Sequence, residues 1–366
     1  MSIRLHFDEG DWERIKRDYA AWWAHALDRP LVQVMATEHD PGIDYPEIHD
    51  FASNYPPEMP AEEVIARVTP HLEATRYYGD AMPRWWANFG PGILAGFLGS
   101  RVNSVPETVW FEPCERRAAK DIHLAYLPDN PWWLRVKELT RAAVEAWEGR
   151  VAVCHTDLGG NLDVVASFLT TETLLYDLYD APEEIDRLVG EVTRLWLRYY
   201  DELDPIIRPA CPGTSPWAPI WSSGSCYMLQ CDFSYMISPD MFERYALPDL
   251  VACCDHLEHG FYHLDGPGAI PHLDLLLDMP RLRGVQWIPG DGNPPPEEWP
   301  DLLKRIIDAG KLCQLYVTAE GALTIVRNLG GKGFLLAIRD EMSSDEAAAF
   351  LRLLGQEDVG GSSRPR

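Results

Sequence analysis

In its second half the chain alternates short apolar runs with longer segments of helical spacing, and this alternation limits the folds open to it more than any other feature. Apolar runs of this length, with helical segments between them, are typical of buried parallel strands joined by crossover helices. The predicted strands are 31–35, 151–155, 261–264, 284–287, 313–317 and 334–338. The predicted helices are 11–27, 60–78, 131–147, 173–179, 182–203, 239–259, 270–277, 296–309, 323–329 and 344–354. So many consecutive units favour a closed (β/α)8 TIM barrel of the α/β class over an open sheet.

The chain is long enough for one large domain or two ordinary ones, with 366 residues of which 46% are hydrophobic. No low-complexity linker interrupts the alternation, which favours one domain. The sequence predicts an N-terminal helical segment over 1–30, a barrel domain over 31–357 and a polar tail over 358–366.

The charge balance excludes some partners. With 57 acidic and 32 basic residues, the net charge of −25 would repel nucleic acid and anionic membrane surfaces. No apolar run approaches the roughly 20 residues that span a bilayer, and the first residues do not resemble a signal peptide, so we expect a cytoplasmic protein with no membrane partner. The 8 cysteines show no Cys-x-x-Cys spacing, which argues against a disulfide framework or a zinc ribbon.

The segment 260–266 reads Gly-Phe-Tyr-His-Leu-Asp-Gly and ends a predicted strand with two polar side chains. Because side chains alternate along a strand, His263 and Asp265 point to the same face. Two potential metal ligands or acid/base groups therefore lie side by side. The plain alternative is a strand-end histidine that forms a hydrogen bond with a turn aspartate.

Other predicted strands also end in polar residues. In a barrel the carboxyl ends of the strands carry the chemistry, so these residues would gather at one rim. They are His155, Asp157, Gln230, Asp232, Gln286 and Asp340. Any one of them could be a helix cap or a turn residue. Their joint occurrence with His263 and Asp265 favours a functional site.

Four stretches of the chain resemble the uroporphyrinogen decarboxylase superfamily, barrel proteins that include methyltransferases acting with corrinoid proteins. The resemblance extends over about 29–354 and is carried by the order and spacing of the stretches 158–183, 237–248, 261–266 and 333–337. The decarboxylases hold their tetrapyrrole substrate with an arginine-rich N-terminal motif. Here the corresponding segment, 28–35, has a single arginine, Arg29, so the resemblance disfavours porphyrinogen decarboxylation.

The corrinoid-dependent relatives bind zinc through a His-x-Cys strand end and a cysteine after the last strand. Matched position by position, these ligands fall on His263, Asp265 and Asp340. Both thiolates are replaced by carboxylates, which makes a harder site that suits an oxygen-bound substrate better than a thiol. The resemblance thus implies a zinc site formed by these three residues, although the same groups could do acid/base work without a metal.

The leading hypothesis is a methyltransferase that moves a methyl group between a small methylated substrate and a corrinoid cofactor. Because the chain has no Asp-x-His-x-x-Gly motif, the corrinoid would be presented by a partner protein. The catalytic residues would be His263, Asp265 and Asp232. The substrate-binding residues would be Asp157, His155, Gln230 and Gln286. The alternatives are a decarboxylase or lyase acting on a small carboxylated substrate, a non-catalytic small-ligand-binding protein, and a hydrolase that uses two carboxylates.

Overall fold

A mostly parallel seven-stranded sheet forms the centre of the computed structural model, which describes residues 3–37, 51–208 and 210–356. Its strands are β1 (Leu31–Thr37), β2 (Thr75–Gly79), β7 (Cys226–Gln230), β8 (His259–Asp265), β9 (Leu282–Ile288), β10 (Leu312–Val317) and β11 (Phe334–Ile338). They are ordered β2-β1-β11-β10-β9-β8-β7, and every neighbouring pair is parallel except β1 with β2. The predicted polar tail, 358–366, lies outside the described residues.

The remaining strands form two small sheets. β3 (Arg84–Trp85) pairs in parallel with β6 (Ala152–Val153), and β4 (Arg101–Val105) forms an antiparallel hairpin with β5 (Thr108–Glu112). Within the described residues the central sheet is not hydrogen-bonded into a closed ring. The predicted α/β class and parallel strands are therefore confirmed, whereas the closed eight-stranded barrel is not.

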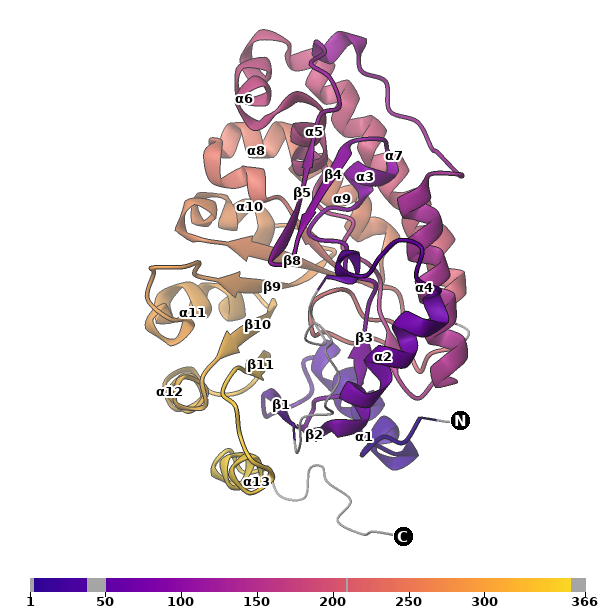
Figure 1. The fold of residues 1–366 in the computed structure, drawn as a ribbon. Helices are drawn as coiled ribbons and strands as arrows, with labels where there is room; N and C mark the ends of the chain where they lie inside the picture. The colour runs from indigo at the N-terminus through magenta and orange to yellow at the C-terminus, as the bar shows by residue number, and fades with distance from the viewer. Residues whose placement is uncertain (1–2, 38–50, 209, 357–366) are drawn as a thin grey trace.

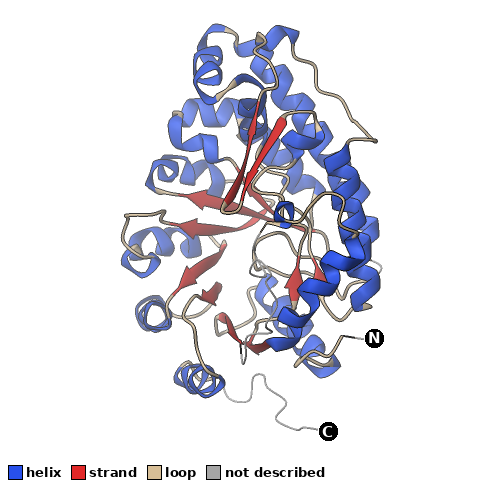
Figure 2. Cartoon of the chain, in the orientation of Figure 1, coloured by secondary structure: helices blue, strands red, loops and turns tan. Residues whose placement is uncertain are grey.

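Helices surround the strands (Figure 2). Along the arc from β8 to β11, α10 (Leu273–Leu277), α11 (Pro300–Asp308), α12 (Ala319–Leu329) and α13 (Ser344–Leu353) lie on the outer side (Figure 1). Before them in the chain, after the first helix, come α2 (Ala61–Ala74), α3 (Leu94–Phe97), α4 (Pro131–Trp147), α5 (Asn161–Leu169), α6 (Thr171–Asp180), α7 (Pro182–Ile207), α8 (Pro239–Tyr245) and α9 (Leu247–His256). None of the helices in the described part of the chain has the length and apolarity needed to cross a membrane.

Two of the predicted helices differ most from the structure. The helix predicted over 60–78 ends at Ala74, and the β-branched and aromatic residues that follow it form β2 against β1. The helix predicted over 239–259 is divided into α8 and α9 just before Pro248, which lacks an N–H and restricts the residue before it. All 8 cysteines are free, as their spacing predicted.

The first helix, α1 (Glu9–Trp23), closes the N-terminal end of the sheet. Its tryptophans pack on the first residues of the strands: Trp22 stacks on Phe261 with ring centres 5.9 Å apart, and Trp23 stacks on His259 at 4.2 Å. The Trp23 indole N–H donates a hydrogen bond of 3.0 Å to the Trp221 carbonyl oxygen. These contacts form an aromatic core that is separate from the core between the sheet and its outer helices.

Candidate functional site

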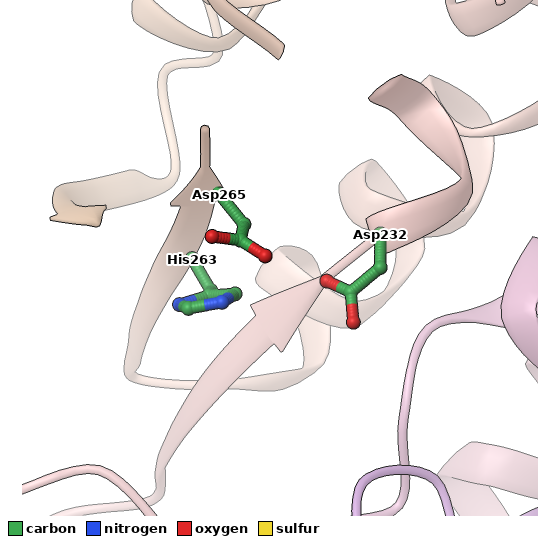
Figure 3. A group of neighbouring side chains, drawn as sticks. All are labelled: Asp232, His263 and Asp265. Atoms are coloured by element: carbon green, nitrogen blue, oxygen red, sulfur yellow. The ribbon is translucent and has the colours of Figure 1, made fainter. Parts of the chain in front are cut away.

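Two neighbouring parallel strands bring three of the predicted site residues together at their carboxyl ends. Gln230 of β7 is paired in register with His263 of β8. Asp232 and Asp265 lie two residues further along, so they emerge side by side beyond the paired residues. One potential ligand atom from each of Asp232, His263 and Asp265 lies within 4.8 Å of the other two (Figure 3). We call these three residues the carboxylate–histidine cluster.

The backbone turns sharply on both sides of the cluster. Gly266 has a φ of +74°, a conformation that glycine adopts without strain, and it ends β8 directly after Asp265. A 3-10 helix (Pro267–His272) then leads away from the site. On the neighbouring strand, Asp232 is the first residue of another 3-10 helix (Asp232–Met236). The two carboxylates are thus held at the points where the chain leaves the sheet.

A row of hydrogen bonds fixes the tautomer of His263. The strand register places His263 beside Gln286 of β9, and Gln286 beside Gln314 of β10. The Gln286 amide N–H donates to the Gln314 side-chain oxygen, so the Gln286 oxygen faces His263 and accepts a hydrogen bond from its Nδ1–H. His263 Nε2 therefore keeps a lone pair, which can bind a metal ion or accept a proton.

The charge state of the cluster follows from its surroundings. Burial lowers the pKa of His263, while Gln286, Asp265 and Asp163 act in the opposite direction, so the imidazole is neutral at neutral pH. The protein atoms packed around Asp232 and the neighbouring Asp265 raise the pKa of Asp232 to about 6, although the residue is exposed at the surface. Above that pH the site holds adjacent negative charges, which a bound cation would stabilise.

Asp163, which the sequence analysis did not select, holds Asp232 in place. Its carboxylate accepts hydrogen bonds from the backbone N–H groups of Asp232 at 3.0 Å and Phe233 at 2.7 Å. Burial and the charge of Asp232 raise the pKa of Asp163 to about 7. Gly160 permits this contact, because a Cβ there would lie 2.3 Å from the Gln230 carbonyl oxygen. The signal available in the sequence was an acidic residue three positions after the Gly159-Gly160 pair, in the first turn of a helix.

Two further predicted residues lie close to the cluster. Asp157 is buried and accepts a hydrogen bond of 2.9 Å from the Gly159 N–H. Burial, with the charges of Asp232 and Asp163, raises its pKa to about 8, so it carries a proton at neutral pH. Gln230 is also buried, and its side-chain oxygen has no hydrogen-bond partner in the described part of the chain. A hollow of about 480 Å³, lined in part by Asp163 and Asp232, opens beside β5 and α5.

The structure places His155 and Asp340 away from the carboxylate–histidine cluster. His155 is buried against α7, where its ring stacks on Tyr200 at 4.3 Å and its Nε2 lies 3.3 Å from an Asp204 oxygen. Asp340 accepts a hydrogen bond from the Ala319 N–H at 2.5 Å, at the first turn of α12. Asp232, which the sequence analysis had assigned to catalysis, lies beside His263 and Asp265 instead.

Comparison with known proteins gives a fold but no family. No family model matches the chain, and no curated protein matches it. Among solved structures, the chain is similar to a methyltransferase from Methanosarcina mazei, with a TM-score of 0.60 and 13% sequence identity over 93% of this chain and 97% of that one. At this identity the likeness shows a shared fold that extends over nearly the whole chain. Membership of the uroporphyrinogen decarboxylase superfamily stays a hypothesis.

Proposed function

We propose that this protein moves a methyl group between a small methylated substrate and a corrinoid cofactor carried by a partner protein, on a barrel of the uroporphyrinogen decarboxylase type. The observation that carries the proposal is the convergence of Asp232, His263 and Asp265 where two adjacent strands end. The shared fold with a methyltransferase supports it at the level of architecture alone.

The residues of the cluster fit a zinc ion. Catalytic zinc sites commonly use three protein ligands drawn from histidine and carboxylates and keep a further position for water or substrate. Here one imidazole nitrogen with a free lone pair faces two carboxylates whose mutual repulsion a divalent cation would offset. The oxygen-rich set suits a substrate whose methyl group is attached to oxygen.

The roles of the chain's own residues follow from their contacts. When bound, zinc would act as a Lewis acid toward the heteroatom that carries the methyl group. Gln286 orients His263, and Asp163 fixes the backbone that carries Asp232. The Trp217 ring lies edge-on to the His263 ring at 5.4 Å and limits the access of water to it. Asp157 holds a proton at neutral pH, so it adds no further negative charge beside Asp232.

The proposed ligand set is tested by zinc titration of protein that has been stripped with a chelator, followed by a methyl-transfer assay with cobalamin and a panel of methyl ethers, methylamines and methyl thioethers. We expect one zinc ion per chain and transfer that depends on it. His263→Ala and Asp232→Asn should lose both. Asp340→Asn is the matched control and should keep both, because the Asp340 side chain accepts a hydrogen bond from the Ala319 N–H at the first turn of α12.

Two outcomes would contradict this assignment. If the native protein takes up no stoichiometric zinc, the proposed metal role of the cluster is wrong. If instead Asp340→Asn loses zinc while Asp232→Asn retains it, the ligand set implied by the family resemblance is right and the set chosen from the geometry is wrong.

A decarboxylase or lyase is the second candidate, and two carboxyl groups beside the cluster, the buried Asp157 and the half-buried Asp163, favour it. Asp157 and Asp163, with pKa values of about 8 and about 7, can each hold a proton near neutral pH. Loss of CO2 leaves an electron pair on the substrate carbon, and such an acid could protonate that carbon. Release of CO2 from small carboxylic acids by zinc-free protein, abolished in Asp163→Asn, would favour this reaction over methyl transfer.

A further inference from the structure

Beside the carboxylate–histidine cluster lies a cavity of about 630 Å³ in which cationic and aromatic side chains gather. It is formed by the ends of β1, β10 and β11, by the segment around β3 and by the loop at 217–219. The lining residues that matter here are Gln33, Arg84, Trp86, Trp217, Tyr316 and Arg339. The cavity adjoins the cluster, because Trp217 also contacts His263. We call it the arginine cavity.

Arg84 is a buried guanidinium that has no anionic partner among the described residues. It is only 7% exposed. Its Nη2 donates to the carbonyl oxygens of Pro216 and Trp217 at 2.7 Å and of Ala218 at 3.0 Å, while its Nε has no partner. In the described part of the chain it forms no ion pair. A buried cation that faces a cavity in this state is costly unless an anion binds it there.

Arg339 supplies a second cation at the rim of the same cavity. Its guanidinium lies over the Tyr316 ring, 4.8 Å from the ring centre, and it has no carboxylate partner among the residues that the structure describes. Burial raises the pKa of Tyr316, and both Arg84 and Arg339 oppose this rise, so both cations act on the same hydroxyl group. The chain has 57 acidic residues, yet among the described residues neither arginine on this cavity has a carboxylate partner, which indicates a site for an external anion.

The walls between the arginines and the cluster are aromatic. Arg84 and Trp86 lie on the same face of the β3 segment, with the guanidinium 5.1 Å from the Trp86 ring centre. Trp217 and Tyr316 line the cavity as well, and the buried Trp217 indole N–H has no partner in the part of the chain that the structure describes. Aromatic walls favour a flat apolar group, because its rings can stack on them.

We infer that the arginine cavity binds a small aromatic carboxylic acid, with its carboxylate on Arg84 and Arg339 and its ring against Trp86 and Trp217. The role of this acid as the substrate rests on the proposed function. The substrate class is then a methoxylated aromatic acid, whose methylated oxygen lies past Trp217, toward His263. The anionic end selects the substrate, and the carboxylate–histidine cluster acts on the other end.

Calorimetric titration with benzoate and with the uncharged benzyl alcohol tests the subsite without any methyl transfer. We expect benzoate to bind the native protein at least about 10-fold more tightly than benzyl alcohol, because a charge-assisted contact is lost with the alcohol. Arg339→Gln should weaken benzoate binding at least about 10-fold while leaving benzyl alcohol unchanged. Arg305→Gln is the matched control: it removes a surface arginine of α11 that pairs with Asp274 at 2.7 Å, and it should change neither affinity.

Arg84→Gln should weaken benzoate binding more than Arg339→Gln, provided that circular dichroism shows a native fold, since Arg84 also holds the loop at 216–218. Equal affinity for benzoate and benzyl alcohol, or benzoate binding unchanged in Arg339→Gln, would overturn the subsite. If benzoate binding depends on the arginines but 4-methoxybenzoate is not demethylated by the zinc-loaded protein with cobalamin, the subsite stands and the proposed methyl transfer fails.

Discussion

The two ends of strand β8 show how one face of one strand serves both stability and chemistry. His259, Phe261, His263 and Asp265 alternate along β8 and point to the same face. At the N-terminal end, Phe261 is fully buried and stacks on Trp22 of α1. At the C-terminal end, His263 and Asp265 meet Asp232 instead. The helix that covers the first end is absent from the second, and this leaves the second end open to ligands.

The two histidines on this face sharpen the contrast. His259 stacks on Trp23, its Nδ1 lies 2.7 Å from the Ser222 hydroxyl, and burial with the nearby Arg283 and Arg281 lowers its pKa to about 4. It is a neutral packing group over the whole physiological range. His263 is also kept neutral by burial, but two carboxylates face it. The same residue type is thus structural at one end and available for chemistry at the other.

The largest expected effects come from replacing neighbouring inward residues of β8 one at a time. Phe261→Ala should lower the free energy of unfolding by about 3–5 kcal/mol, the usual cost of truncating a buried phenylalanine. It should leave one zinc ion bound to the folded fraction. His263→Ala should abolish zinc binding and methyl transfer yet lower the free energy of unfolding of the metal-free protein by only about 1–2 kcal/mol, because it leaves the buried Gln286 oxygen without its donor. Urea unfolding and zinc content measured on both variants test this.

The assignment of stability to one end of β8 and zinc binding to the other is wrong if either variant shows the effect expected of the other. Loss of zinc in folded Phe261→Ala would show that the N-terminal packing shapes the site directly. A loss of stability in metal-free His263→Ala as large as that in Phe261→Ala would make His263 a core residue.

Much of this contrast could be predicted from the sequence. The alternation of apolar runs and helical segments predicted the parallel strands, and the two-residue period of a strand placed His263 and Asp265 on one face. Asp232 belongs to the carboxylate–histidine cluster because β7 pairs with β8 and the two strands end at the same level of the sheet. Asp340 follows β11, and both β9 and β10 lie between that strand and β8. Strand order, which periodicity does not contain, decides between the two aspartates.

Two features could not be predicted from the sequence: the hydrogen bonds by which Asp163 holds the backbone at Asp232, and the packing of the α1 tryptophans on the N-terminal end of the sheet. An acidic residue in the first turn of a helix has a sufficient local explanation, the attraction of a carboxylate to the helix N-terminus. Its contacts with the N–H groups of residues 232 and 233 depend on the close approach of α5 to β7 at Gly160. The surface that the tryptophan pair of α1 covers is likewise set by the tertiary structure.

A change of pH should separate the two ends without any mutation. A proton competes with zinc for the Asp232 carboxylate, whose pKa of about 6 lies above the usual value for an aspartate. Zinc affinity should therefore be steady above about pH 7 and fall about 10-fold for each pH unit below 6. At the other end, His259 stays neutral down to about pH 4, so the near-ultraviolet circular dichroism of the α1 tryptophans should not change between pH 7 and pH 5. Zinc affinity that is constant over this range would contradict the role of Asp232 as a ligand.

The smallest expected effect compares two capping aspartates, one near each end. Asp163→Ala removes the acceptor for the Asp232 and Phe233 N–H groups, and Asp8→Ala removes the N-cap of α1, which accepts from the Asp11 N–H at 3.1 Å. Each should cost about 1 kcal/mol of stability. Zinc affinity should fall about 10-fold in Asp163→Ala, as it does when a residue that orients a metal ligand is lost, and stay unchanged in Asp8→Ala. Asp163→Asn, which keeps one oxygen acceptor, should recover part of that affinity. Equal zinc affinity in Asp163→Ala and Asp8→Ala would reduce Asp163 to a helix-terminal charge and leave the position of Asp232 to the strand register alone.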